Sequence, residues 1–318
     1  MPLHEQKLIA RIRRGAVRQA GVVKGIGDDC AVLKVPIGNE VLVTTDFTLE
    51  GVHFRREWHA PEVVGRRCLT RGLSDIGAMG GRPIAAFLSL AVPQALPQRW
   101  VDGFLKGFLQ LADQFETTLA GGDTAESKSG ILADIVVLGS VPRGKAILRS
   151  GAKPGDGIYV SGELGGATAA LKKLFRGEKV RPGDYPRHFH PTPRVEVGQW
   201  LREKKIASAM IDLSDGLSTD LTHICEESGV GADLVASQIP RAAVGQRHRP
   251  VTLDAAVHGG EDYELLFTAP ARKQVPATIA GVPIYRIGRI TSGSGIVLAQ
   301  AGGKKHTLKP AGWEHFHR

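Results

Sequence analysis

Acidic side chains recur beside glycine, serine or threonine in short segments spread along the whole chain. These segments are GIGDD with Asp28 and Asp29, TTDFTLEGVHF with Asp46, LSDIGAMGG with Asp75, AGGDTAES with Asp123, IDLSDG with Asp212 and Asp215, and HGGEDYELL with Glu261 and Asp262. Carboxylate oxygens suit Mg²⁺, which a few carboxylates usually hold together with substrate phosphates. Neighbouring glycines let a bulky polyphosphate approach backbone amides. We therefore expect these acids, at loops where strands end, to converge on a site for divalent cations and a phosphorylated ligand.

These acids also have a purely structural explanation. Ser214 and Asp215 precede the apolar stripe of a predicted helix, where an N-cap is expected. Asp262 and Glu264 alternate with apolar residues, as the exposed positions of a strand do. Six segments with one pattern favour the cation site, because carboxylates gathered at one place repel one another unless cations neutralise them.

Other catalytic groups are scarce in the sequence. No GxSxG motif occurs, and no cysteine has a recognisable nucleophile context, so covalent catalysis has no candidate. Among the histidines we retain His53, which directly follows the segment with Asp46. His188 and His190 lie in a connection rich in proline, histidine and basic residues, over residues 176–193, which we expect at the surface.

The elements that must position these residues follow from hydrophobic periodicity. Apolar runs bounded by glycine, proline or polar residues predict strands at residues 41–45, 84–92, 131–138, 158–161 and 284–290. After Pro97, aromatic and leucine side chains recur at spacings of three and four, which predicts a helix whose aromatic stripe packs in the core. A segment rich in glycine, proline and charge, over residues 142–157, predicts a domain junction near Arg149.

Composition limits the class of protein. The chain has 318 residues, of which 42% are hydrophobic and 23% charged, so a disordered polymer is excluded and two domains are expected. The longest apolar run, over residues 84–92, is far short of the roughly 20 residues that cross a bilayer. Three widely spaced cysteines and a charged N-terminal segment favour a cytoplasmic protein. The net charge of +9 is compatible with nucleic acid, an anionic membrane or small polyanions.

The acidic segments, together with RSGAKPGD, resemble in order and spacing the signature segments of the thiamine-monophosphate kinases, and the resemblance extends to the closing GWEHF. It implies a two-domain α/β (α+β) fold like that of aminoimidazole ribonucleotide synthetase. Residues 1–148 would form an N-terminal ATP- and magnesium-binding domain, whose sheet makes a barrel across a homodimer. Residues 149–318 would form a C-terminal α/β domain. The implied reaction transfers the γ-phosphoryl group of ATP to thiamine monophosphate, with several Mg²⁺ ions as cofactors.

The same resemblance implies roles for individual residues. The implied magnesium ligands are Asp29, Thr44, Thr45, Asp46, Asp75, Asp123, Asp212 and Asp215. The implied ATP contacts are Gly122, Asp123, Arg149 and Ser214, and the implied contacts to thiamine monophosphate are His53, Glu261 and Trp313. No separate catalytic base is implied, because a phosphate oxygen of the substrate is the nucleophile.

Two other functions remain open at this stage. The first is another ATP-using enzyme of the same superfamily with a different acceptor; HGGEDYELL and His53 favour the thiamine branch. The second is a nucleic-acid-binding protein, which rests on the charge of +9 alone. Because the basic residues are scattered and no nucleic-acid-binding motif occurs, we expect neither nucleic acid nor a membrane as a partner.

Overall fold

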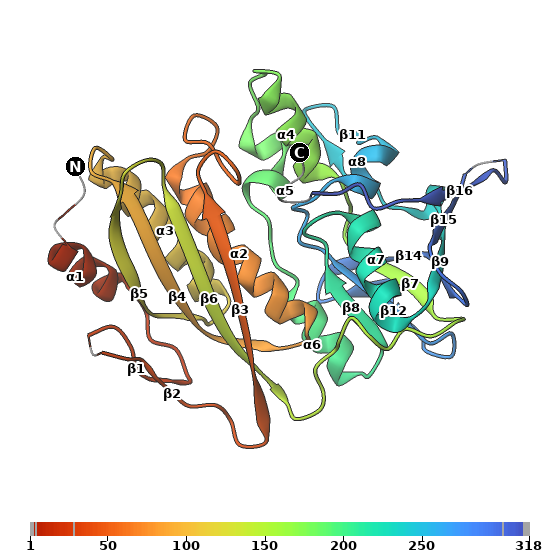
Figure 1. Cartoon of the computed structure of the whole chain (residues 1–318), viewed down its shortest axis with the longest axis horizontal. Helices are drawn as coiled ribbons and strands as arrows, with labels where there is room; N and C mark the ends of the chain where they lie inside the picture. Colours follow the sequence, from red (N-terminus) through yellow and green to blue (C-terminus); the bar gives the residue numbers. More distant parts are fainter. Residues whose placement is uncertain (1–2, 4, 28, 301, 314–318) are drawn as a thin grey trace. The chain divides into compact units, whose positions relative to one another are not determined.

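The computed structural model describes residues 3, 5–27, 29–300 and 302–313, and the chain divides into two compact units (Figure 1). The first unit comprises residues 1–76 and 81–144, and the second comprises residues 77–80 and 145–318. The boundary predicted after residue 148 lies in an irregular segment, residues 143–156, between two strands. Within the described residues, no helix is both long enough and apolar enough to cross a membrane.

The first unit is built on a four-stranded sheet in the order β3-β6-β4-β5, with β4 and β5 parallel and the other neighbours antiparallel. Its elements are α1 (Glu5–Gly15), β1 (Val22–Lys24), β2 (Val32–Leu33), β3 (Asn39–Leu49), α2 (Pro61–Ala78), β4 (Arg82–Pro93), α3 (Gln98–Gln114), β5 (Thr118–Ser127) and β6 (Leu132–Pro142). The strands predicted at residues 41–45, 84–92 and 131–138 are confirmed as parts of β3, β4 and β6.

Helices α2 and α3 cover one face of this sheet (Figure 1). The predicted aromatic stripe is core: the rings of Trp100 and Phe104 stack with centroids 5.7 Å apart, and those of Phe104 and Phe108 stack at 6.4 Å. Helix α2 approaches the strands closely at Gly72, where an added Cβ would lie 2.5 Å from Cγ2 of Val137. Glycine at this position therefore permits the close contact between helix and sheet.

The second unit is built on an eight-stranded sheet in the order β16-β15-β9-β14-β7-β12-β8, with β13 paired to β14. Its elements are β7 (Gly157–Ser161), α4 (Gly166–Phe175), η1 (Pro182–Asp184), α5 (Pro186–Phe189), α6 (Val195–Glu203), β8 (Ala209–Asp212), α7 (Leu217–Ser228), β9 (Gly231–Val235), η2 (Ala236–Gln238), β10 (Ala243–Val244), β11 (Arg249–Pro250), α8 (Leu253–His258), β12 (Leu265–Ala269), β13 (Thr278–Ile279), β14 (Val282–Thr291), β15 (Ile296–Ala299) and β16 (Lys305–Leu308). The strands predicted at residues 158–161 and 284–290 are confirmed as β7 and β14.

Apolar side chains pack on both faces of this second sheet. Residues of α4, α7 and α8 form one buried cluster with it, and residues of α6 form another with its opposite face. The prediction that residues 176–193 form only a surface connection is wrong, because His188 and Phe189 are buried. Their rings pack edge to face with centroids 4.9 Å apart, so this part of the histidine-rich segment lies in the interior of the unit.

Candidate functional site

Strand β3 presents Thr44 and Asp46 on the face of the sheet that α2 covers. The hydroxyl of Thr44 donates a hydrogen bond to the carboxylate of Asp75 on α2. Asp46 lies two residues further along a strand with unbroken register, so its side chain shares that face. The half-buried oxygens of Thr44, Asp46 and Asp75 form the first group of predicted ligands.

Thr45 lies on the opposite face of β3. Its hydroxyl donates a 3.0 Å hydrogen bond to Asp134 on β6, so its side chain is separated by the sheet from those of Thr44 and Asp46. The sequence predicted Thr45 but not Asp134, because the pairing of β3 with β6 joins residues 89 positions apart.

The other predicted residues of the first unit are exposed or half-buried. Asp123 is exposed on β5, where its Oδ1 accepts the N–H of Thr124 at 2.8 Å. Gly122 has a φ of 147°, and an added Cβ would lie 1.9 Å from the carbonyl oxygen of Leu88, so only glycine fits there. Asp29 is exposed beside Asp28, which lies outside the described residues.

His53 follows β3 in a turn. Its Nδ1 accepts the backbone N–H of Leu49 at 3.0 Å, so the neutral ring carries its proton on Nε2. The side chain lines a small recess together with Thr48, Phe54 and Arg67. His53 therefore has the tautomer of a hydrogen-bond donor at Nε2.

The expectation that the acids lie at loops where strands end holds only in part. Asp46 lies within β3, Asp75 within α2 and Asp123 within β5. Asp212 does end β8, and Asp215 follows it in a loop.

In the second unit, three segments far apart in the sequence converge at the end of β8. The backbone N–H of Glu261 donates to the carbonyl oxygen of Ser214 at 2.7 Å, and that of Trp313 donates to the carbonyl oxygen of Asp215 at 3.1 Å. Asp212 is buried, Ser214, Asp215 and Glu261 are half-buried, and Trp313 is 55% exposed. Backbone hydrogen bonds thus bring together predicted metal, ATP and substrate residues.

Where these segments meet, several residues have rare backbone dihedral angles or leave no room for a Cβ atom. Glu261 and Tyr263 have positive φ values of 65° and 51°, which non-glycine residues adopt rarely. At Gly260 and Gly312, an added Cβ would lie 2.5 Å from the carbonyl oxygen of Ser214 and 2.1 Å from that of Asp215. Such strain persists where the surrounding structure demands it, as it often does at functional sites.

The N-cap explanation for Ser214 and Asp215 is wrong. The N-cap of α7 is Gly216, without a side-chain hydrogen bond, and the loop is held instead by Asp220 within the helix. Oδ2 of Asp220 accepts the N–H of Gly216 at 2.9 Å and that of Asp215 at 3.3 Å. Asp220 was not among the predicted site residues, although its place five residues beyond Asp215 in IDLSDGLSTDL was a signal.

Asp220 also reports the electrostatics of the site. Burial, followed by the negative charges of Asp212 and Asp215, raises the pKa of Asp220 well above its ordinary value, against the effect of the two N–H groups. Three carboxylates therefore lie near enough to repel one another.

The alternative that Asp262 and Glu264 are exposed strand positions is also wrong, because both are buried. Asp262 accepts the N–H groups of Gly165 and Ala167, at 2.5 and 3.2 Å, and so binds the N-terminus of α4. Burial raises the pKa of Asp262 to about 7, although these hydrogen bonds oppose the rise.

Glu264 is fully buried in an ionic cluster. Its carboxylate accepts hydrogen bonds from Nε and Nη2 of Arg194, at 2.7 and 2.6 Å, from Arg187 and, at 2.6 Å, from the hydroxyl of Ser161. Two cations and a hydroxyl satisfy the carboxylate, so Glu264 is a structural residue.

Arg149, the predicted phosphate-binding cation, is exposed at the start of the RSGAKPGD loop. The hydroxyl of Ser228, at the end of α7, donates to the carbonyl oxygen of Arg149 at 3.1 Å and accepts the N–H groups of Gly151 and Ala152. The loop is thereby fixed to the helix that begins beside Asp215.

The donor set suits a hard cation. Within the residues that the structure describes, no three histidine, cysteine, aspartate or glutamate side chains are arranged as a metal-binding group. Carboxylate and threonine oxygens are nevertheless the donors that Mg²⁺ prefers, with waters and substrate phosphates completing its shell.

We predict that Asp220→Ala destabilises the protein by about 1–3 kcal/mol, because two buried backbone N–H groups lose their acceptor. Hydrogen exchange of the amides of Asp215 and Gly216 should accelerate. Asp220→Asn is the matched control, since its oxygen can keep both hydrogen bonds while its neutral side chain no longer repels Asp212. Unchanged exchange at Gly216 in the alanine variant would contradict this role.

We predict that Asp262 makes stability fall as pH rises from about 4 to about 7. Its folded pKa of about 7 exceeds the unfolded value of about 3.9, so the native state binds the extra proton across that window. Relative to Asp262→Asn, the wild-type free energy of unfolding should drop on the order of 2–4 kcal/mol across it. Denaturant titrations at several pH values measure this, with the exposed Asp254→Asn as a control that follows the wild type. Parallel pH profiles for wild type and Asp262→Asn would be the contrary result.

Comparison with known proteins identifies both halves of the chain. Residues 27–141 match the model of the AIR synthase related protein N-terminal domain, and residues 153–300 match that of the C-terminal domain. The match is consistent with a mixed α/β architecture in two domains.

Relatives that align over nearly the whole chain identify the family within this superfamily. Thiamine-monophosphate kinase of Escherichia coli K12 is 36% identical over 328 aligned positions, which cover 99% of each chain. The crystal structure of thiamine-monophosphate kinase from Stenotrophomonas maltophilia K279a is 37% identical, with a TM-score of 0.82, and covers 96% of this chain and 98% of that one. A structure described as AaThiL complexed with AMPPCP and TMP is 32% identical, with a TM-score of 0.77 and 92% of each chain covered. The chain thus belongs to the thiamine-monophosphate kinase family.

Proposed function

We propose that this protein transfers the γ-phosphoryl group of ATP to thiamine monophosphate, giving thiamine diphosphate. The observation that carries the proposal is the convergence of Ser214, Asp215, Glu261 and Trp313 from three separate segments. Each belongs to a segment that resembles a family signature, and the relative AaThiL has been solved with AMPPCP and TMP.

The chief difficulty of this reaction is electrostatic. At about 4 Å and an effective dielectric of about 20, each pair of like unit charges costs ~4 kcal/mol, and two phosphorylated reactants bring several such pairs together. Bound Mg²⁺ supplies neutralisation and alignment of the phosphates. The terminal phosphate oxygen of the substrate is already deprotonated, so the protein need not provide a general base.

The proposed magnesium ligands of each unit are oxygen donors. In the first unit they fall into two groups: Thr44, Asp46 and Asp75 on the face of the sheet that α2 covers, and Thr45 and Asp123 on the opposite face. The remaining proposed ligands are Asp29 and, in the second unit, Asp212 and Asp215. The hydrogen bond from Thr44 orients Asp75, and Asp220 orients the loop of Asp215. Because these groups are held by the fold, little ordering is needed when a cation binds.

The proposed nucleotide contacts are Gly122, Asp123, Arg149 and Ser214. Gly122 is required where β5 packs against β4, because an added Cβ would overlap the carbonyl oxygen of Leu88. Arg149 offers a guanidinium that binds phosphate oxygens through paired hydrogen bonds. Ser228 fixes the backbone from which Arg149 extends.

The proposed contacts to thiamine monophosphate are His53, Glu261 and Trp313. His53 offers an Nε2 donor, in keeping with its hydrogen bond from Leu49. Glu261 offers negative charge and Trp313 an aromatic face, and both suit a cationic thiazolium ring. The backbone of Glu261, with its positive φ, is held at the Ser214 loop by the hydrogen bond from its N–H to Ser214.

The direct test incubates the purified protein with ATP, Mg²⁺ and thiamine monophosphate and separates the products by chromatography. We expect thiamine diphosphate in the wild type and a loss of about 100-fold or more in kcat for Asp46→Asn and Asp212→Asn, since each variant loses a carboxylate that is proposed to hold Mg²⁺, the ion that neutralises the transferred phosphoryl group. Unchanged unfolding curves would show that the variants are folded. Full turnover by either variant would remove that residue from the site, and no thiamine diphosphate in the wild type would refute the function.

We predict that Trp313→Ala raises KM for thiamine monophosphate while leaving KM for ATP unchanged. A cation–π contact is worth roughly 0.5–2 kcal/mol, which corresponds to about a twofold to thirtyfold weaker interaction. Trp313→Phe, which keeps an aromatic face, serves as the control. Equal increases in KM for both substrates would argue against stacking on the thiazolium.

We also propose a homodimer in which the first unit's sheet packs against its copy and completes a barrel. Strand β3 is an edge strand, and Val43 and Phe47 are 64% and 55% exposed on the face away from α2. An exposed apolar face at an open sheet edge is suited to association.

We predict that Val43→Asp combined with Phe47→Asp converts the dimer to a monomer, because the copy would have to bury four unpaired carboxylates. Sedimentation velocity measures the change. Phe175→Asp, on an exposed residue of the second unit, is a control that should stay dimeric. A monomeric wild type at micromolar concentration, or a dimeric double variant, would exclude this interface.

A further inference from the structure

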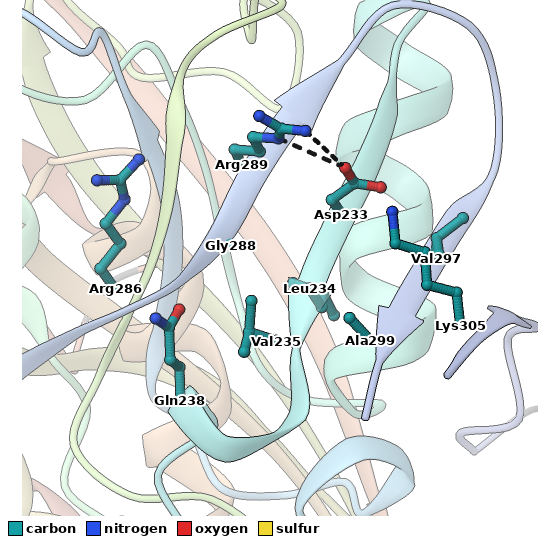
Figure 2. Close-up of a pocket in the computed structure, with 10 residues that line it drawn as sticks. All are labelled: Asp233, Leu234, Val235, Gln238, Arg286, Gly288, Arg289, Val297, Ala299 and Lys305. Atoms are coloured by element: carbon teal, nitrogen blue, oxygen red, sulfur yellow. Dashed lines mark hydrogen bonds and ion pairs between the residues drawn. The ribbon is translucent and has the colours of Figure 1, made fainter. Parts of the chain in front are cut away.

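A hollow of about 340 Å³ lies on the second unit's sheet, at strands β9, β14, β15 and β16 (Figure 2). Its lining includes Asp233 and Val235 of β9, Arg286 and Arg289 of β14, Val297 of β15 and Lys305 of β16. None of the residues assigned to phosphoryl transfer lines it. The volume lies at the lower end of the roughly 300–1,000 Å³ of small-molecule sites.

A β-bulge explains why two arginines of one strand line the same hollow. Residues three apart in a regular strand point to opposite faces. The pairing of β14 with β7 shifts register between Arg286 and Gly288, and this extra residue brings Arg286 and Arg289 to one face while Ile287 enters the core on the other. Bulges commonly re-aim side chains at binding sites.

Gly288 allows the strands to stay close at this bulge. An added Cβ at Gly288 would lie 2.1 Å from the carbonyl oxygen of Asp233. The hollow therefore has bare backbone at this position, between the two arginines (Figure 2).

The charge of the lining is unbalanced. Arg289 pairs with Asp233 at 3.2 Å, whereas among the described residues neither Arg286 nor Lys305 pairs with an acid. Three cations against one carboxylate leave a net charge of +2. A phosphate monoester carries about −1.5 to −2 at neutral pH, which matches that excess.

The remaining lining is apolar. Val235, Val297 and Ala299 are half-buried on the same face, and Gln238 also lines the hollow (Figure 2). Apolar surface of this kind contacts an organic group, which inorganic phosphate lacks. We propose that this hollow binds a small organic phosphate, which is attracted by the excess positive charge of Arg286, Arg289 and Lys305 and whose organic group lies on Val235, Val297 and Ala299.

The test uses phenyl phosphate as the probe and methyl-labelled full-length protein in nuclear magnetic resonance titrations. We expect saturable shifts at the methyl groups of Val235, Val297 and Ala299. Arg286→Ala combined with Lys305→Ala should weaken binding about tenfold or more, through the loss of the hollow's two excess positive charges. Arg272→Ala combined with Lys304→Ala removes the same charges outside the hollow and should bind as the wild type does.

Two further ligands separate the contributions to binding. Inorganic phosphate and phenol should each bind more weakly than phenyl phosphate. Shifts that do not saturate, equal affinity in the two double variants, or inorganic phosphate binding as tightly as phenyl phosphate would overturn the proposal. Because Arg286 and Lys305 are outside the phosphoryl-transfer machinery, thiamine diphosphate formation by their double variant is expected to be unchanged, which keeps this test separate from that of the enzyme activity.

Discussion

Repulsion between carboxylates is the constraint on which this structure depends. Burial and the charges of Asp212 and Asp215 raise the pKa of Asp220, so the second unit holds three acids close together at a cost in stability. The fold tolerates that cost by fixing the loop through two hydrogen bonds, from the N–H of Gly216 to the carboxylate of Asp220 and from the N–H of Trp313 to the carbonyl oxygen of Asp215. A site that is unfavourable when empty is suited to binding positive charge, as the proposed magnesium-assisted reaction requires.

Buried acids in the same unit have two different fates. Glu264 is surrounded by arginine and serine donors and serves the packing, whereas Asp262 binds the N-terminus of α4 through backbone N–H groups. Both lie in the segment that also carries Glu261, which is half-buried at the Ser214 loop. One short stretch of sequence thus contains two buried structural carboxylates and one half-buried candidate substrate contact. The difference in burial distinguishes the two roles.

Glycine and register shifts set the positions of functional side chains in both units. Gly122 of β5 leaves room for the backbone of Leu88 in β4. Gly260 and Gly312 allow three segments to meet around Ser214 and Asp215. In β14, a single extra residue places Arg286 and Arg289 on one face. In each case the absence of a side chain, or one inserted residue, determines how closely two backbones approach or on which face a side chain lies.

The sequence by itself determined the acid-bearing segments, the main strands, the aromatic helix and, through their order, the family, because these signals are local or depend only on spacing. Only the tertiary structure decided that Thr45 faces Asp134 and that Asp220 supports the Asp215 loop. It also decided that Asp262 and Glu264 are buried. These outcomes depend on strand register and on contacts between distant segments, and a side chain's face, burial and partners are set by such long-range pairing, which local periodicity does not encode.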